Sequence, residues 1–147
     1  MSRTSLLDRE VGRAMSALSA AAKRGLGDPA LAELVMIRAS QLNHCAFCLD
    51  MHLAIAREQG VSERQLDMLS GWEEAGDVFD GRERAALALT EAVTVLTDGF
   101  VPDEVYVEAG RRFAAAELAH LVALVTAVNS WNRVMVARRI PPGGYTP

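Results

Sequence analysis

The residues best suited to chemistry lie in one short segment, the nine residues from His44 to His52, which read His-Cys-Ala-Phe-Cys-Leu-Asp-Met-His. Two cysteines stand three positions apart, Cys45 and Cys48, and His52 follows the second by four positions. In a helix, steps of three and four residues place side chains on one face, so we expect the two sulfurs to meet and Cys48 to meet the imidazole. The spacing predicts a thiol pair supported by a histidine.

Such a pair acts through the thiolate, because the thiolate and not the thiol is the nucleophile. A free cysteine has a pKa of about 8.5 and is mostly protonated at neutral pH. A helix N-terminus and a nearby imidazolium both lower a thiol pKa, and pairs of the Cys-x-x-Cys type reach roughly 3.5 to 7.5. Once one sulfur is oxidised, the other is close enough to form a disulfide and prevent further oxidation. The segment therefore predicts a redox-active pair.

Two other interpretations of this segment stay open. Free cysteines are often small buried hydrophobic residues without a chemical role. Alternatively, Cys45, Cys48, His44 and His52 offer thiolate and imidazole ligands for Zn²⁺, although the second half of a usual zinc site is missing from the sequence. We favour the redox pair, because two inert cysteines leave the position of His52 one turn after Cys48 to coincidence, and a zinc site lacks its second half. A metal-binding or redox-sensing module without turnover is the rival hypothesis.

The composition is that of an ordinary globular chain, with 147 residues, half of them apolar, and a formal net charge of −4. We expect a single domain over residues 1–147. No basic stripe favours nucleic acid as a partner, and Arg138–Arg139 suits a solvated helix end. The first twelve residues lack the apolar core of a signal peptide, and the longest apolar run, 121–128, is too short to span a bilayer. We therefore expect no membrane contact and a cytosolic location, where a cysteine pair is typically catalytic or metal-binding.

The hydrophobic periodicity is helical nearly everywhere and predicts an all-α fold of about seven helices. Capping and helix-breaking residues set the expected boundaries: Asp28 before Pro29 opens one helix, and Ser62 with Gln65 forms a capping-box pattern. The segment 70–80 is expected to be a connecting loop that carries Trp72 and Phe79 as packing anchors. The expected helices cover approximately 6–24, 29–42, 45–59, a fourth opened by Ser62, a fifth from Asp80 to Asp98, a sixth begun by Pro102, and a seventh over 115–138, before a tail over 140–147.

The last of these helices is apolar over much of its circumference and must be covered on several sides. In a chain of this size, a subunit interface is a natural place for that cover. His120 lies in this helix and is expected to be a core or interface histidine and not a ligand. Trp72 and Trp131, like the methionines at 36, 51, 68 and 135, are expected to fill the core.

The sequence resembles the alkylhydroperoxidase AhpD-like branch of the carboxymuconolactone decarboxylase family. The resemblance rests on Glu33, which stands twelve residues before the cysteine pair, and on Cys45, Cys48 and His52. Three further stretches, 81–87, 90–94 and 129–133, also look like this branch. Together these features cover roughly residues 30–139.

The resemblance implies an all-helical fold that assembles into homo-oligomers, often trimers or hexamers. It implies hydroperoxide reduction without a bound cofactor or metal, with Cys48 attacking the peroxide. Cys45 would resolve the sulfenic acid and accept electrons from a lipoylated or thioredoxin-like reductant. Glu33 and His52 match the family's proton relay. An unbroken helix would hold Glu33 about 17 Å from residue 44, so the chain must turn back, and a helical hairpin around Asn43 would achieve this.

The sequence departs from the family pattern between the cysteines. The best-characterised peroxidases carry an additional histidine there, whereas this chain has Ala46 and Phe47. The relay is therefore shorter, or His44 substitutes for the missing group. Helix capping by itself would favour Cys45 as the first attacker, because the N-terminal cysteine of such a pair is usually the reactive one. We follow the resemblance in assigning attack to Cys48. The decarboxylase activity of other family members does not depend on such a pair and is not expected here.

Overall fold

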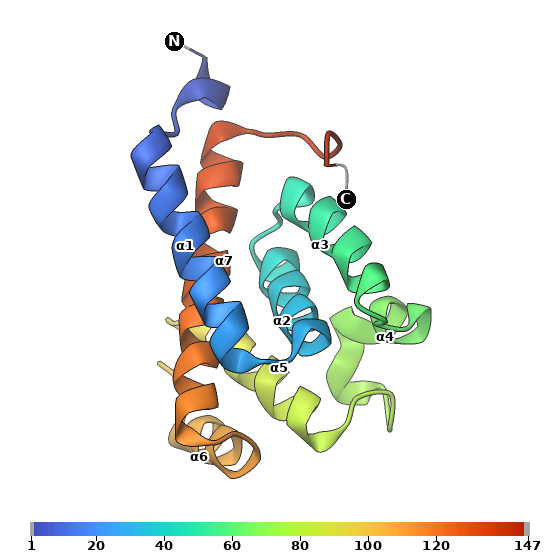
Figure 1. The fold of residues 1–147 in the computed structure, drawn as a ribbon. Coiled ribbons are helices and arrows are strands. Elements are labelled where there is room, and N and C mark those ends of the chain that lie inside the picture. The colour runs from blue at the N-terminus through green and yellow to red at the C-terminus, as the bar shows by residue number, and fades with distance from the viewer. Residues whose placement is uncertain (1, 146–147) are drawn as a thin grey trace.

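The computed structural model describes residues 2–145, in which helices are joined by short turns (Figure 1). No strand occurs among these residues, so the all-α prediction and the predicted number of α-helices are confirmed. The α-helices are α1 (Arg9–Leu26), α2 (Pro29–Leu42), α3 (Ala46–Glu58), α4 (Glu63–Met68), α5 (Gly81–Thr94), α6 (Asp103–Arg112) and α7 (Ala115–Arg138), with two 3-10 helices, η1 (Arg3–Ser5) and η2 (Leu69–Glu74).

The predicted boundaries are confirmed where a capping side chain sets them. The Asp28 carboxylate accepts a hydrogen bond from the Leu31 backbone N–H (3.1 Å) at the start of α2, and the Ser62 hydroxyl accepts one from Gln65 N–H (3.1 Å) before α4. At the start of α7, the Glu117 carboxylate accepts a hydrogen bond from the Ala114 backbone N–H (2.8 Å). That hydrogen bond, together with one from Arg82, holds the pKa of Glu117 below its ordinary value.

The predicted start of the first helix at residue 6 is wrong, whereas its end lies close to the predicted place, at the glycines after residue 24. The helix begins at Arg9 because the Asp8 carboxylate caps it, accepting hydrogen bonds from the backbone N–H groups of Glu10 and Val11. It continues through Gly25, which stays helical, and ends only where Gly27 adopts the left-handed conformation (φ 69°).

Two further boundaries differ from prediction. Part of the expected loop 70–80 is the 3-10 helix η2, which holds the Trp72 indole N–H 2.7 Å from the Glu91 carboxylate. Trp72 and Phe79 are buried, so their predicted role as anchors is confirmed. The fifth helix ends at Thr94 and not at Asp98, since the chain leaves helical geometry at Val95 and turns through residues 95–101. Leu96, which lies in this turn, is exposed.

The central element is α2, which is covered on nearly all sides (Figure 1). Its Leu31 and Val35 belong to a hydrophobic cluster shared with α1, α5, α6 and α7, whereas Leu34 and Ile37 belong to a second cluster shared with α3, α4, η2 and α5. Because both faces of α2 are buried, Glu33 is buried as well, with 3% of its surface exposed. Any charge that α2 carries must find partners inside the protein.

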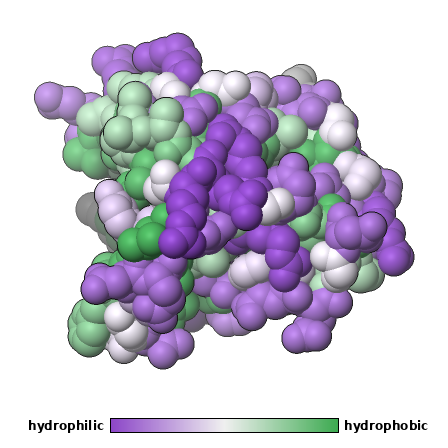
Figure 2. Space-filling model, turned by 90° about the horizontal axis from the view of Figure 1, so that it is seen from below, coloured by the Kyte–Doolittle hydropathy of each residue, from purple (hydrophilic) through white to green (hydrophobic). Residues whose placement is uncertain are grey.

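The long helix α7 lies beside α1 and packs on α2 and α5, so much of its apolar surface is covered within one chain (Figure 1). Large hydrophobic side chains nevertheless stay exposed elsewhere, among them Leu96, Phe100, Tyr106 and Val107. Figure 2 shows the face seen from below as mostly hydrophilic, with hydrophobic residues gathered toward its left edge. Assembly into a homo-oligomer stays a prediction. None of the helices between residues 2 and 145 is long and apolar enough to cross a membrane.

The close contact between α1 and α7 depends on the absence of a side chain at Gly25. A Cβ atom at this position would lie 1.9 Å from Cδ2 of the His120 ring. That ring is held in place because its Nδ1–H donates a hydrogen bond to the Ala116 carbonyl (2.7 Å). His120 is thus a packing residue at a helix contact, in agreement with the sequence-based expectation.

This contact leads to a test by double substitution. We expect Gly25→Ala to lower the free energy of unfolding by about 1–3 kcal/mol, because the added methyl group overlaps the His120 ring. In a His120→Ala background, the same change should stabilise the protein by up to about 1 kcal/mol, since alanine is the better helix former. Urea unfolding of the four variants measures the difference. Equal effects in both backgrounds would contradict the assigned contact.

Candidate active site

The tight connection between α2 and α3 positions the two cysteines. The chain turns back over residues 43–45, with His44 in the left-handed conformation (φ 53°), as the predicted hairpin around Asn43 requires. The backbone N–H of Cys45 donates to the Ser40 carbonyl (3.0 Å), which closes the turn. Cys45 is therefore the N-cap residue of α3 and not its first helical residue, as the predicted span 45–59 had it. Its sulfur accepts a hydrogen bond from the backbone N–H of Cys48 (3.3 Å).

The two sulfurs are joined in a disulfide, with a Cα–Cα distance of 5.3 Å between Cys45 and Cys48. Both residues are buried, with 1% and 2% of their surface exposed. The expectation that this spacing brings the sulfurs together is confirmed. The pair can cycle between dithiol and disulfide without a large backbone movement, because both cysteines lie at one helix start.

The turn also brings Glu33 of α2 against His52 of α3, two residues that are nineteen positions apart. Oε2 of Glu33 lies 2.8 Å from Nδ1 of His52, and both side chains are buried. An ionised carboxylate only accepts hydrogen bonds, so Nδ1 carries the proton of the neutral imidazole. Nε2 is then the ring nitrogen left to act as a base.

A third group joins this pair from α1. Nζ of Lys23 lies 3.6 Å from Oε1, the other carboxylate oxygen of Glu33. The lysine side chain is 38% exposed, whereas that of Glu33 is 3% exposed. Lys23 is therefore the partner through which this buried ion pair reaches solvent. Sequence reasoning missed Lys23, since no fixed spacing connects a residue on α1 with the cysteine pair.

Cys48 and His52 face a cavity of about 460 Å³ enclosed by α1, α2, α3 and α7. This volume lies in the range of small-molecule sites. Three methionines and Trp131, which were expected to fill the core, form part of its wall, together with Phe47 and small side chains. The lining residues are Ser16, Ser19, Ala20, Lys23, Met36, Phe47, Cys48, Met51, His52, Val128, Trp131 and Met135. The reactive groups therefore stand at the edge of a largely apolar space.

Cys45 opens on a different side of the disulfide. It lines a separate cleft of about 420 Å³ together with His44, Arg3 and Arg139. His44 is exposed and belongs to this cleft, whereas Glu33 and His52 do not. The hypothesis that His44 replaces the missing histidine of the relay is therefore not supported by its position. The two cysteines thus line different cavities.

No group of three or more His, Cys, Asp or Glu side chains within residues 2–145 is arranged to hold a metal ion. The zinc hypothesis required four ligands from one segment. In the structure Nδ1 of His52 is bonded to Glu33, and His44 and His52 lie at different cavities. These residues are not brought together as a ligand set.

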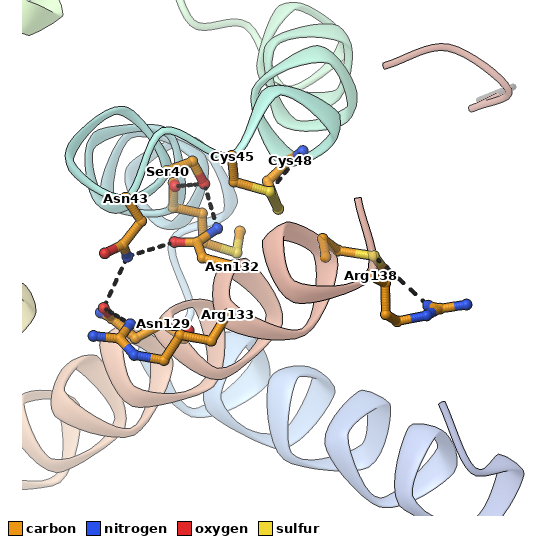
Figure 3. Close-up of a disulfide and its surroundings, with 10 residues drawn as sticks. Ser40, Asn43, Cys45, Cys48, Asn129, Asn132, Arg133 and Arg138 are labelled. Carbon is orange, nitrogen blue, oxygen red and sulfur yellow. Dashed lines mark hydrogen bonds between the residues drawn. A yellow bond between two sulfur atoms is a disulfide. The ribbon is translucent and has the colours of Figure 1, made fainter. Parts of the chain in front are cut away.

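A network of amide side chains from α7 fixes the turn that carries Cys45 (Figure 3). Asn132 is fully buried; its Nδ2 donates to the Ser40 hydroxyl (3.0 Å) and its Oδ1 accepts from Asn43 Nδ2 (2.9 Å). Asn43 Nδ2 also donates to Asn129 Oδ1 (2.9 Å). The stretch 129–133, known from the sequence only as part of a family resemblance, thus has a structural role next to the disulfide.

The carboxymuconolactone decarboxylase family model matches residues 9–92, which include α1, both cysteines and the Glu33–His52 pair. The chain belongs to this family, and to its AhpD-like members. The match begins earlier than the predicted resemblance, because it includes α1, the helix that contributes Lys23.

Similar proteins agree with this assignment. The uncharacterised protein YdfG of Bacillus subtilis is 40% identical over 105 residues, 71% of each chain, and the uncharacterised protein YnjA of Escherichia coli is 32% identical over 123 residues, 83% of this chain and 66% of that protein. A crystal structure of a protein of unknown function from Agrobacterium tumefaciens, suggested to be the antioxidant defence protein AhpD, superposes with a TM-score of 0.88 at 30% identity over 94% of both chains.

The amide network gives a prediction for stability. We expect Asn132→Ala to lower the free energy of unfolding of the oxidised protein by about 1–3 kcal/mol, because it removes two buried hydrogen bonds to the turn. Ser130→Ala, on the same helix but bonded only within it, should change stability by less than about 0.5 kcal/mol. Urea unfolding of both variants provides the comparison. Equal stability of the two would show that the network does not hold the turn.

Proposed function

We propose that this protein is a thiol-dependent peroxidase that reduces organic hydroperoxides through a dithiol–disulfide cycle of Cys45 and Cys48. The observation that supports it most is the position of Cys48. This sulfur is bonded to Cys45, and Cys48 lines an apolar cavity of about 460 Å³ together with His52, whose ring is bonded to Glu33. A hydroperoxide with a hydrocarbon body fits such a space, whereas a redox sensor or a metal site needs no cavity of this kind.

The cycle begins with the reduced pair. The Cys48 thiolate attacks the terminal oxygen of the hydroperoxide, the O–O bond breaks, and the departing alkoxide takes up a proton to become an alcohol. Cys48 is thereby oxidised to a sulfenic acid. The Cys45 sulfur then attacks the Cys48 sulfur, the disulfide forms, and the hydroxyl group leaves as water.

In this cycle His52 acts as the base that takes the proton of the Cys48 thiol. His52 follows Cys48 by one helical turn, lines the same cavity, and has Nε2 free for the exchange. Glu33 holds the ring through Nδ1 and stabilises the imidazolium that forms, as the carboxylate of a catalytic triad does.

Cys45 serves as the resolving residue and as the point of entry for electrons. Its separate cleft allows a reductant to approach without passing through the hydroperoxide cavity. Because Cys45 is only 1% exposed, the reductant must present a slender dithiol, and a lipoyl arm or the exposed cysteine of a thioredoxin-like protein meets this requirement. A homo-oligomeric, cytosolic enzyme without a cofactor completes the proposal.

Turnover with a dithiol donor tests this function directly. We expect reduced protein to consume cumene hydroperoxide continuously in the presence of dihydrolipoamide, while free thiols at Cys45 and Cys48 disappear and return. Cys48→Ser should abolish consumption, whereas Cys45→Ser should consume one equivalent and accumulate a sulfenic acid that dimedone traps. A single stoichiometric oxidation of the wild-type protein would instead indicate a sensor, and turnover by Cys48→Ser would contradict the assigned attacker.

The role of the Glu33–His52 pair can be measured without any peroxide. We expect His52→Ala to slow the alkylation of reduced Cys48 by iodoacetamide at pH 7 by about 10²-fold, because no base remains to take the thiol proton. Glu33→Gln should have a smaller effect in the same direction, since the amide still holds the ring but does not stabilise its positive charge. His44→Ala is the matched control. An unchanged alkylation rate in His52→Ala would remove His52 from the mechanism.

A further inference from the structure

Lys23 is the single lysine of this chain; every other member of its fifteen lysine and arginine residues is an arginine. The neighbouring position 24 is one of these arginines. A chain that uses arginine for every other basic position has a lysine only where the side chain adjoins Glu33 and the Cys48 cavity. This suggests a property that lysine has and arginine lacks.

The two side chains differ in what they can do with a proton. The guanidinium of arginine does not release its proton in proteins, whereas the ammonium of lysine can release one and take one up. If Lys23 served only to balance the buried charge of Glu33, an arginine would serve as well, and would offer more hydrogen bonds. The choice of lysine therefore favours a role in proton transfer.

Lys23 lies where a proton donor could act on a bound hydroperoxide. Its side chain lines the cavity that also contains Cys48 and His52. At the same time its ammonium lies 3.6 Å from one oxygen of Glu33, while His52 bonds the other oxygen at 2.8 Å. Lys23 and His52 are thus separated by a single carboxylate, and both face the space where the O–O bond would break.

Hydroperoxide reduction needs an acid at this place. The alkoxide that leaves is a strong base, so its departure is difficult unless a proton reaches it as the O–O bond breaks. The cavity wall offers few groups able to supply one, since most lining residues are apolar or small. His52 lines the cavity and gains the Cys48 proton as the thiolate forms, whereas the Lys23 ammonium carries a proton from the start.

Resting on the proposed function, we propose that Lys23 is the general acid that protonates the departing alkoxide, and that the Glu33–His52 pair returns to it the proton taken from the Cys48 thiol. The proton balance closes without an outside donor. The thiol proton passes to His52, the Lys23 ammonium gives a proton to the alkoxide, and the resulting amine is reprotonated from the imidazolium through Glu33. The products are the alcohol and the Cys48 sulfenic acid.

Leaving groups of different basicity separate this role from a structural one. Cumene hydroperoxide releases a strongly basic alkoxide, whereas peroxybenzoic acid releases benzoate, a weak base that leaves without help. The experiment measures the burst of cumyl alcohol or benzoate in a single turnover of reduced protein, all variants in a Cys45→Ser background. We expect Lys23→Met to slow the reaction with cumene hydroperoxide by about 10²-fold, and that with peroxybenzoic acid by less than about threefold.

Two further variants complete the test. Lys23→Arg keeps the positive charge next to Glu33 but not the transferable proton, so it should stay at least about tenfold slow with cumene hydroperoxide. Arg24→Met removes the neighbouring cation, which does not line the Cys48 cavity, and should react like the parent with both peroxides.

The possible results lead to different conclusions. Equal slowing of both peroxides by Lys23→Met, or full activity of Lys23→Arg, would overturn the acid role and leave Lys23 with a structural or purely electrostatic one. An unchanged rate in Lys23→Met would overturn it as well. The absence of any burst in the parent protein with cumene hydroperoxide would instead reject the proposed peroxidase function, and the acid role with it.

Discussion

A carboxylate buried in the middle of a helical protein needs partners, and the carboxylate of Glu33 finds them on two other helices. Removing an ion from water costs several kcal/mol unless hydrogen bonds and opposite charges replace the lost hydration. His52 on α3 and Lys23 on α1 meet this demand, and each of them contacts one oxygen of the Glu33 carboxylate. The requirement fixes how α1, α2 and α3 stand relative to one another, and it sets the position of the imidazole next to Cys48.

The disulfide lies at the end of the same arrangement. Since α2 must be followed by a turn tight enough to bring α3 back against Glu33, the first cysteine falls in the turn and the second inside the helix. The two cysteines consequently line different cavities, Cys48 the apolar one and Cys45 the cleft with Arg3 and His44. The amides of α7 hold this turn through Ser40 and Asn43.

Features encoded by neighbouring residues were predictable from the sequence. Asp28 with Pro29, and Ser62 with Gln65, cap helices through bonds that span three residues, and the predicted boundaries there are correct. The pairing of the cysteines follows from their spacing, whereas the approach of Glu33 to His52 was inferred from the family resemblance and from the turn it requires. Features that depend on packing escaped prediction. The hydrogen bond of Trp72, those of Asn132 and the ion pair of Lys23 each join residues that are distant in the sequence. No local sequence pattern therefore predicts them.

The positions of these residues show what the departure from the family pattern between the cysteines changes in the site. Where the best-characterised relatives of this branch carry a histidine, this chain has Ala46 and Phe47, and Phe47 lies in the wall of the Cys48 cavity. An aromatic ring there makes the cavity more apolar and removes one group able to move a proton. In the proposed mechanism, the proton path of the remaining groups runs through Glu33, whose second oxygen lies 3.6 Å from the Lys23 ammonium. In the proposed mechanism, Lys23 on α1 is the proton donor, and no histidine between the two cysteines is needed for that step.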